Sequence, residues 1–149
     1  MTDAPFDLGS ADPQEVARTV RTVSDEDLTA LMQSELRPQI LAEIFGRMEE
    51  HFRGEKAGDL GAVMHWKIFD RPGGGYDHVE IVVADGRCSV SDRPTHEPDV
   101  TLKAKPADFL KLVTGNAGPK TMALRGRLRV QGDLGLAAKL GGLFEIPRA

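Results

Sequence analysis

Residues 99–144 constrain the fold more than any other stretch, because two short alternating segments enclose a helical segment in a fixed order. Val100, Leu102 and Ala104 alternate with polar residues, which is the period of a strand with one buried face. Pro106 follows at a position where a helix tolerates a missing N–H. This part of the chain therefore predicts a strand that leads directly into a helix.

The remainder of the stretch predicts a short helix, a second strand and a last helix. Gly115 stands where a left-handed C-cap would end the first helix. Leu128 and Val130 alternate with arginines, as in a half-buried strand. The apolar stripe of the last helix, after Gly132, consists of Leu136, Ala137, Leu140, Leu143 and Phe144.

This order of elements resembles the type-2 sterol carrier protein family of small lipid-binding domains. The matching segments are DVTL at 99–102, DFL at 108–110, Gly115, GRLRVQGD at 126–133 and LAAKL at 136–140. Each motif is weak alone, but their order and spacing over roughly 45 residues are fairly specific. The chain departs from the family in having arginines around Leu128, where lysines are usual, and Leu124 at a position that is more often aromatic.

The resemblance implies an α/β (α+β) fold with a five-stranded, mostly antiparallel sheet, helices packed on one face, and an apolar tunnel between them. A chain of 149 residues suffices for one domain with a real core. We expect residues 36–149 to form the sterol carrier protein-like domain. Residues 1–35 would be an N-terminal extension with a disordered start and two short helices.

Three helices are predicted before the first strand. Asp12-Pro13 is a good start for a helix to about Val23, and Ser24 with Asp27 resembles a capping box for a second helix. Arg37-Pro38 interrupts that helix, and a third helix with a wide apolar face runs to about Phe52.

Two strands, 62–70 and 76–84, are joined by the glycine-rich loop 71–75, which indicates a hairpin rather than a phosphate cradle because a strand follows it. Asp85-Gly86 then turns the chain into a third short strand, 87–91. One register gives coherent pairs on both faces of the hairpin. The pairs are Trp66 with Val79 and Met64 with Ile81 on the inner face, and Lys67 with His78 and His65 with Glu80 on the outer face.

An apolar set from strands and helices forms either a filled core or the wall of a tunnel, and periodicity alone does not distinguish the two. Only the family resemblance favours a tunnel. Its predicted lining is Met64, Trp66, Ile81, Val83, Leu102, Phe109, Val113, Met122, Leu124, Leu136, Leu140 and Phe144.

The basic residues Lys120, Arg125, Arg127 and Arg129 form either an ordinary solvated face or an anion site. As an anion site they would contact a ligand head group or dock on an anionic membrane. The net charge of −4 disfavours general nucleic-acid binding.

The titratable residues give no strong catalytic or metal signal. The four histidines lack metal-ligand spacing, so no metal site and no cofactor are expected. Cys88, the only cysteine, is more consistent with a small core residue than with a nucleophile.

The expected localisation is cytoplasmic. The N-terminus does not resemble a leader peptide, and no apolar run could span a membrane. The C-terminal Ile-Pro-Arg-Ala does not match a peroxisomal targeting signal.

Three functions follow as hypotheses. The first is a non-catalytic carrier that shields a sterol, fatty acid, fatty acyl-CoA or similar lipid, with helix 134–144 as the gate. The second is an enzyme or accessory factor that acts on a hydrophobic metabolite in the same cavity, with His65, His78, Glu80 and Asp108 as acid/base candidates. The third is a structural or regulatory module with a collapsed cavity, whose N-terminal helices pack on the domain or on a second copy. A monomer and a homodimer both remain open.

Overall fold

The structure is a computed structural model, and it describes residues 13–141 and 143. In this part of the chain, four helices precede the first strand, and strands and helices then follow one another to the end of α7. The elements in chain order are α1 (Pro13–Thr22), α2 (Asp25–Met32), α3 (Arg37–Glu50), α4 (Gly54–Ala57), β1 (Ala62–Ile68), β2 (Asp77–Ala84), β3 (Arg87–Ser91), β4 (Val100–Ala104), α5 (Pro106–Val113), α6 (Pro119–Leu124), β5 (Leu128–Gly132) and α7 (Leu134–Gly141).

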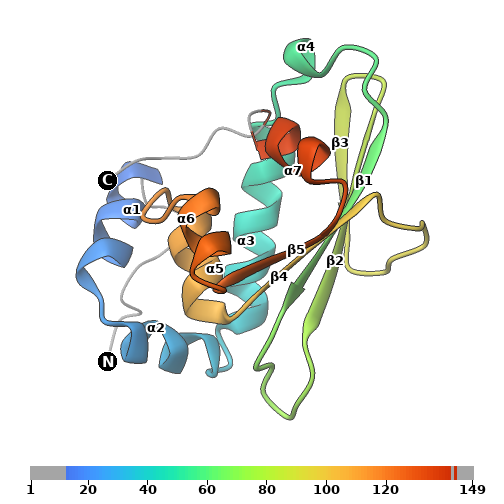
Figure 1. Ribbon diagram of the computed structural model, residues 1–149. Coiled ribbons are helices and arrows are strands. Elements are labelled where there is room, and N and C mark those ends of the chain that lie inside the picture. Colours follow the sequence, from blue (N-terminus) through green and yellow to red (C-terminus); the bar gives the residue numbers. More distant parts are fainter. Residues whose placement is uncertain (1–12, 142, 144–149) are drawn as a thin grey trace.

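The strands of the described residues form one five-stranded sheet in the order β3-β2-β1-β4-β5. The central pair β1 and β4 is parallel, and the other neighbours are antiparallel. Figure 1 shows the larger helices on one side of this sheet, which we call its inner side. The predicted fold class, a mostly antiparallel sheet with helices packed on one face, is therefore confirmed.

The predicted hairpin register is confirmed at every pair. Trp66 lies opposite Val79 on the inner face, and His65 lies opposite Glu80 on the outer face. Strand β1 ends at Ile68, before the predicted Asp70, and β2 begins at Asp77. Asp70 has a φ of 53°, which lies outside the range of a β-strand. The short helix α4 was not predicted.

The N-terminal helices share the core of the domain. Helices α1 and α2 pack on α5, and Val20, Leu28 and Met32 are fully buried in the same hydrophobic cluster as the sheet. The predicted cap of α2 is present, since the Asp27 N–H donates to the Ser24 hydroxyl at 3.1 Å. The large apolar side chains of these two helices whose burial the structure describes therefore pack within this chain's own core.

Arg37 joins the helical layer to the end of the hairpin, and sequence reasoning missed this contact. Its side chain is only 1% exposed, and its Nε lies 2.7 Å from Oδ2 of Asp77. The remaining guanidinium N–H groups donate to backbone carbonyls, three of them at the end of β1 and just after it. The carbonyl acceptors belong to Met32, Ile68, Phe69 and Asp70.

Replacing Arg37 with Met is expected to lower the free energy of unfolding by about 3–5 kcal/mol, because it leaves Asp77 and several carbonyls without their partner. Urea unfolding followed by circular dichroism measures the loss. Arg18→Met, at an exposed position of α1, is the matched control and should change stability by less than about 0.5 kcal/mol. Equal losses in the two variants would contradict the assigned role of Arg37.

Candidate functional site

Alternate residues of every strand point to the helices, and on this inner face they are apolar except for Asp77 at the end that Arg37 covers. Trp66 of β1 has Val79 on one side and Leu102 on the other. Met64 stands beside Ile81 in the next row. These five apolar side chains are buried, with at most 9% of their surface exposed.

Three aromatic rings connect this face to the helices. The Trp66 ring meets Phe109 of α5 edge-on, with 5.1 Å between centroids. Phe109 in turn packs on Phe45 of α3 at 5.5 Å. Such contacts add to the energy of simple area burial and fix the ring positions. The layer between sheet and helices therefore has a defined aromatic centre.

Apart from Leu124, the residues predicted to line a tunnel fall into three groups. Met64, Trp66, Ile81, Val83, Leu102, Phe109 and Met122 are buried in the layer between sheet and helices. Val113 and Leu136 are half-buried and pack against the same cluster. Phe144 and the side chain of Leu140 lie outside the described residues. The tunnel itself stays a prediction.

Leu124 does not occupy the buried position that was expected of it. Its side chain is 89% exposed, whereas Met122 on the same helix is 3% exposed. Two residues apart on a helix correspond to about 200° of rotation, so one of the pair must face outward. Because α6 spans only six residues, its direction could not be deduced from periodicity.

A surface hollow among the described residues lies elsewhere. It has a volume of about 430 Å³ and sits between α2 and the loop that joins β1 to β2. Its lining is mostly polar or glycine and consists of Thr29, Gln33, Asp70, Arg71, Gly74 and Gly75. That lining does not suit an apolar ligand.

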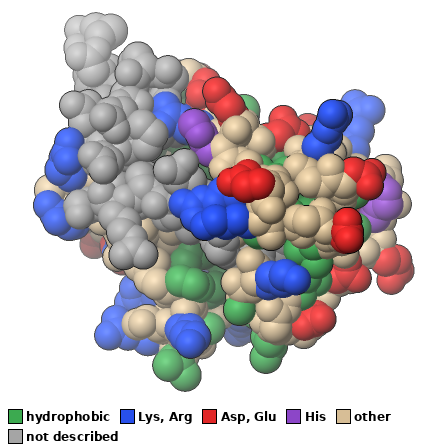
Figure 2. All heavy atoms as spheres, turned by 90° about the horizontal axis from the view of Figure 1, so that it is seen from above, with side chains coloured by type: hydrophobic (Ala, Val, Ile, Leu, Met, Phe, Trp, Pro, Cys, Tyr) green, Lys and Arg blue, Asp and Glu red, His purple; other side chains and the backbone are tan. Residues whose placement is uncertain are grey.

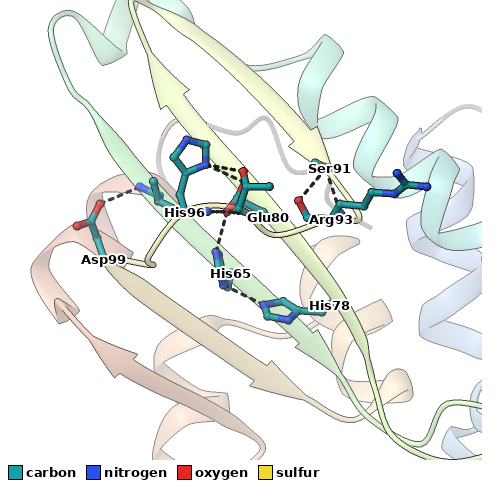
Figure 3. A network of polar contacts seen from close by, with 9 residues as sticks. His65, His78, Glu80, Ser91, Arg93, His96 and Asp99 are labelled. Carbon is teal, nitrogen blue, oxygen red and sulfur yellow. Dashed lines mark hydrogen bonds and ion pairs between the residues drawn. The ribbon is translucent and has the colours of Figure 1, made fainter.

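The outer face of the sheet carries a polar network, and the topology explains it (Figure 3). One row of outer-face residues crosses four strands, and it consists of Ser91 of β3, Glu80 of β2, His65 of β1 and Thr101 of β4. Loop 92–98 runs from one end of that row to the other, across the outer face (Figure 1). Glu80 and His65 lie beneath it and are only 2% and 4% exposed.

Glu80 is the centre of this network. Its Oε2 accepts hydrogen bonds from the backbone N–H groups of Thr95 and His96, at 3.1 and 2.8 Å. Nδ1 of His96 lies 3.1 Å from Oε1, and Nε2 of His65 lies 3.1 Å from Oε2. Burial opposes ionisation of Glu80, but these hydrogen bonds outweigh it and lower its pKa to about 2.

His65 links Glu80 to a second histidine. Nε2 of His78 lies 2.9 Å from Nδ1 of His65. A neutral His65 that donates from Nε2 to Glu80 and accepts at Nδ1 from His78 satisfies both contacts. Burial lowers the pKa of His78, and electrostatic interactions with His65 and Lys67 lower it further.

The other titratable candidates are held in structural roles. Asp108 is 9% exposed, its pKa is raised by burial, and its Oδ1 lies 3.7 Å from Nη1 of Arg127. Burial and Glu49 raise the pKa of the half-buried Cys88 to about 12, so its thiolate is scarce at neutral pH. In the described part of the chain no three His, Cys, Asp or Glu side chains are grouped to hold a metal ion.

The predicted basic residues Lys120, Arg125, Arg127 and Arg129 are all exposed. Arg129 belongs to a row that sequence reasoning missed, because its members come from three strands. It lies opposite Lys103 of β4, which lies beside Lys67 of β1 on the outer face. We call Lys67, Lys103 and Arg129 the basic row.

Among the described residues, no Asp or Glu side chain forms an ion pair with a member of the basic row. Nζ of Lys67 lies 5.1 Å from the centre of the Tyr76 ring, a partly exposed aromatic on the same side. Like charges directly opposite one another in a sheet are destabilising. An anion bound at this row would relieve that repulsion.

Comparison with known proteins gives one consistent result. Residues 41–145 match the SCP-2 sterol transfer family. Human sterol carrier protein 2 is 32% identical over 105 residues, which cover 70% of this chain and 19% of the human protein. The chicken (Gallus gallus) protein of the same name is 34% identical over 56% of this chain and 15% of its own length. The chain thus spans about a fifth or less of these curated relatives.

Solved structures share the fold at low identity. A sec-alkylsulfatase from a Pseudomonas species has a TM-score of 0.59 at 16% identity over 70% of this chain and 16% of its own. A palmitated sterol carrier protein 2-like protein of Aedes aegypti has a TM-score of 0.56 at 18% identity, over 73% of this chain and 97% of its own.

Glu80→Gln is expected to lower the free energy of unfolding at neutral pH by about 1–3 kcal/mol, because the amide cannot accept all the hydrogen bonds that the carboxylate accepts. The folded-state pKa is about 2 and the reference value is 4.5. The stabilisation by ionised Glu80 is therefore complete above pH 4.5 and is lost as the pH falls toward 2.

Urea unfolding of both proteins between neutral pH and pH 3 measures this dependence. The difference between wild type and variant should narrow as the pH falls below 4.5. Glu97→Gln, exposed on the same loop, should show no comparable loss. A difference that stays constant down to pH 3 would show that the charge of Glu80 is not the stabilising feature.

Proposed function

Because the chain belongs to the SCP-2 sterol transfer family, we propose that it binds and transfers an apolar lipid between the inner face of its sheet and the helices. A sterol, a fatty acid or a fatty acyl-CoA fits this class. The observation that supports the site most strongly is the inner face itself, which is centred on Trp66 and Phe109 and is apolar except at Asp77, the partner of Arg37 at the end of β1. No covalent chemistry and no cofactor are part of the proposal.

Helix α7 is the proposed gate. Leu134 at its start is 65% exposed, and Leu136 is only half-buried against the core. The helix is eight residues long and contains Gly135, which weakens helicity by about 1 kcal/mol relative to Ala. Of the α7 side chains whose exposure the structure describes, none is fully buried, so the helix should open at a lower cost than the sheet or α5.

The proposed affinity is moderate, as a carrier requires. Burial of ~12 methylenes would give ~10 kcal/mol before costs. Association and ordering reduce this to about micromolar affinity. A ligand held at that strength is shielded from water and still released.

The basic row supports transient contact with an anionic membrane as the delivery step. Each cation near such a surface contributes about 1 kcal/mol of attraction. Tyr76 beside Lys67 adds an aromatic side chain of the kind that favours the interface. By contrast, the face seen from above in Figure 2 intersperses acidic and basic side chains. None of the described helices is long and apolar enough to cross a bilayer.

The alternatives have less support. For an enzyme acting in the inner layer, His65, His78 and Glu80 lie on the wrong face of the sheet. For a scaffold that uses its N-terminal helices, Val20 and Leu28 are already buried in this chain's own core. The carrier proposal conflicts with neither observation.

The wild-type protein is expected to take up a fluorescent fatty acid or sterol with about micromolar affinity, measured by fluorescence titration. Leu136→Asp, which puts a charge on the inner side of α7, should weaken uptake by about fivefold or more, since a charge resists burial. Leu134→Asp on the exposed side of the same helix is the matched control and should bind like wild type. Failure of the wild-type protein to take up either probe would overturn the carrier proposal.

Replacing Lys67 and Lys103 together with Gln is expected to weaken binding to phosphatidylserine-containing vesicles by about 10- to 30-fold, as the loss of two cations implies. Vesicle flotation at low ionic strength measures it. Lys56→Gln with Lys139→Gln removes the same charge from exposed positions elsewhere and should have a smaller effect. Equal losses in both pairs, or equal wild-type binding to neutral phosphatidylcholine vesicles, would contradict docking through the basic row.

A further inference from the structure

Trp66 holds a buried hydrogen-bond donor without an acceptor. It is the only tryptophan of the chain, and it is 3% exposed at the centre of the inner face. Its indole Nε1–H has no hydrogen-bond partner, and among the described residues no other buried side-chain nitrogen or oxygen is left unsatisfied. A buried donor left without an acceptor lowers stability, because it has lost its hydrogen bonds to water.

The described side chains around the indole are apolar and offer its N–H no acceptor. Its neighbours on the sheet are Val79 and Leu102, and its ring packs on Phe109. A phenylalanine in the same place would fill much of the space and carry no polar atom. Elsewhere the structure satisfies buried polar groups closely, as Arg37 and Glu80 show.

We propose that the Trp66 N–H donates a hydrogen bond to an oxygen of the bound lipid. This inference rests on the proposed function and narrows its ligand class. The ligand carries a hydrogen-bond acceptor on the part that enters the apolar layer. A plain hydrocarbon would leave the donor unpaired and bind less tightly.

The acceptor is uncharged. A single N–H does not compensate for the burial of a carboxylate in apolar surroundings. The buried cation on the inner side, Arg37, lies toward the end of β1 and is already bonded to Asp77 and to carbonyls there. A hydroxyl, ketone or ester oxygen therefore fits the site, and the charged end of an ionised lipid would stay at the surface.

The test compares two probes that differ only in the acceptor, a long-chain methyl ketone and the alkane of equal length, delivered from cyclodextrin. For each protein the measured quantity is the ratio of the two dissociation constants, so the different solubilities of the probes cancel between proteins. Trp66→Phe should reduce the preference for the ketone by about fivefold to tenfold, as the loss of one hydrogen bond implies. Phe69→Leu, which removes an aromatic ring that packs on Tyr76 and not on the indole, is the control and should retain the preference.

A second readout needs no variant. The single tryptophan gives one indole N–H signal in a proton–nitrogen correlation spectrum, and that proton should shift downfield with the ketone and not with the alkane. An unchanged indole signal with bound ketone, or a preference that survives in Trp66→Phe, would overturn the inference while the carrier function stands. Binding of neither probe by the wild type would overturn both.

Discussion

The pairing register between β1 and β2 is the constraint on which the rest of the structure depends. It sends Trp66 to the helices and His65 to the opposite side. A slip of one residue would exchange the two faces, placing imidazole and carboxylate groups against α5 and leaving the indole beneath a polar loop. The polar network of Glu80 and the aromatic contact of Trp66 with Phe109 both favour the observed register.

Strand order then divides the two faces between two tasks. Because β3 and β4 are separated by two strands, their connection must cross the sheet, and it crosses the outer face. There it supplies the N–H groups of Thr95 and His96 that make a buried Glu80 carboxylate tolerable. The inner face is mostly apolar, and the proposed ligand would lie there. The part of the outer face that the loop does not cover carries the basic row, which we propose contacts a membrane.

Local patterns predicted the described helices and strands other than α4. They also predicted the hairpin register, because alternation in both strands and the glycine-rich loop agree on one pairing. They could not reveal the role of Arg37, whose partners other than Met32 lie 31 to 40 residues away. Nor could they show that a loop buries His65, that Leu124 points outward on a six-residue helix, or that the Trp66 donor lacks an acceptor. These features arise when distant segments meet, and no spacing within one segment encodes them.

The claim that lipid lies between the inner face and the helices is tested most directly by nuclear Overhauser effects between isotope-labelled palmitate and the protein. Contacts from the acyl chain to the rings of Trp66 and Phe109 are the result predicted here. An acyl chain that contacts only outer-face side chains, such as Lys67 or Tyr76, would contradict it and place the lipid on the other side of the sheet.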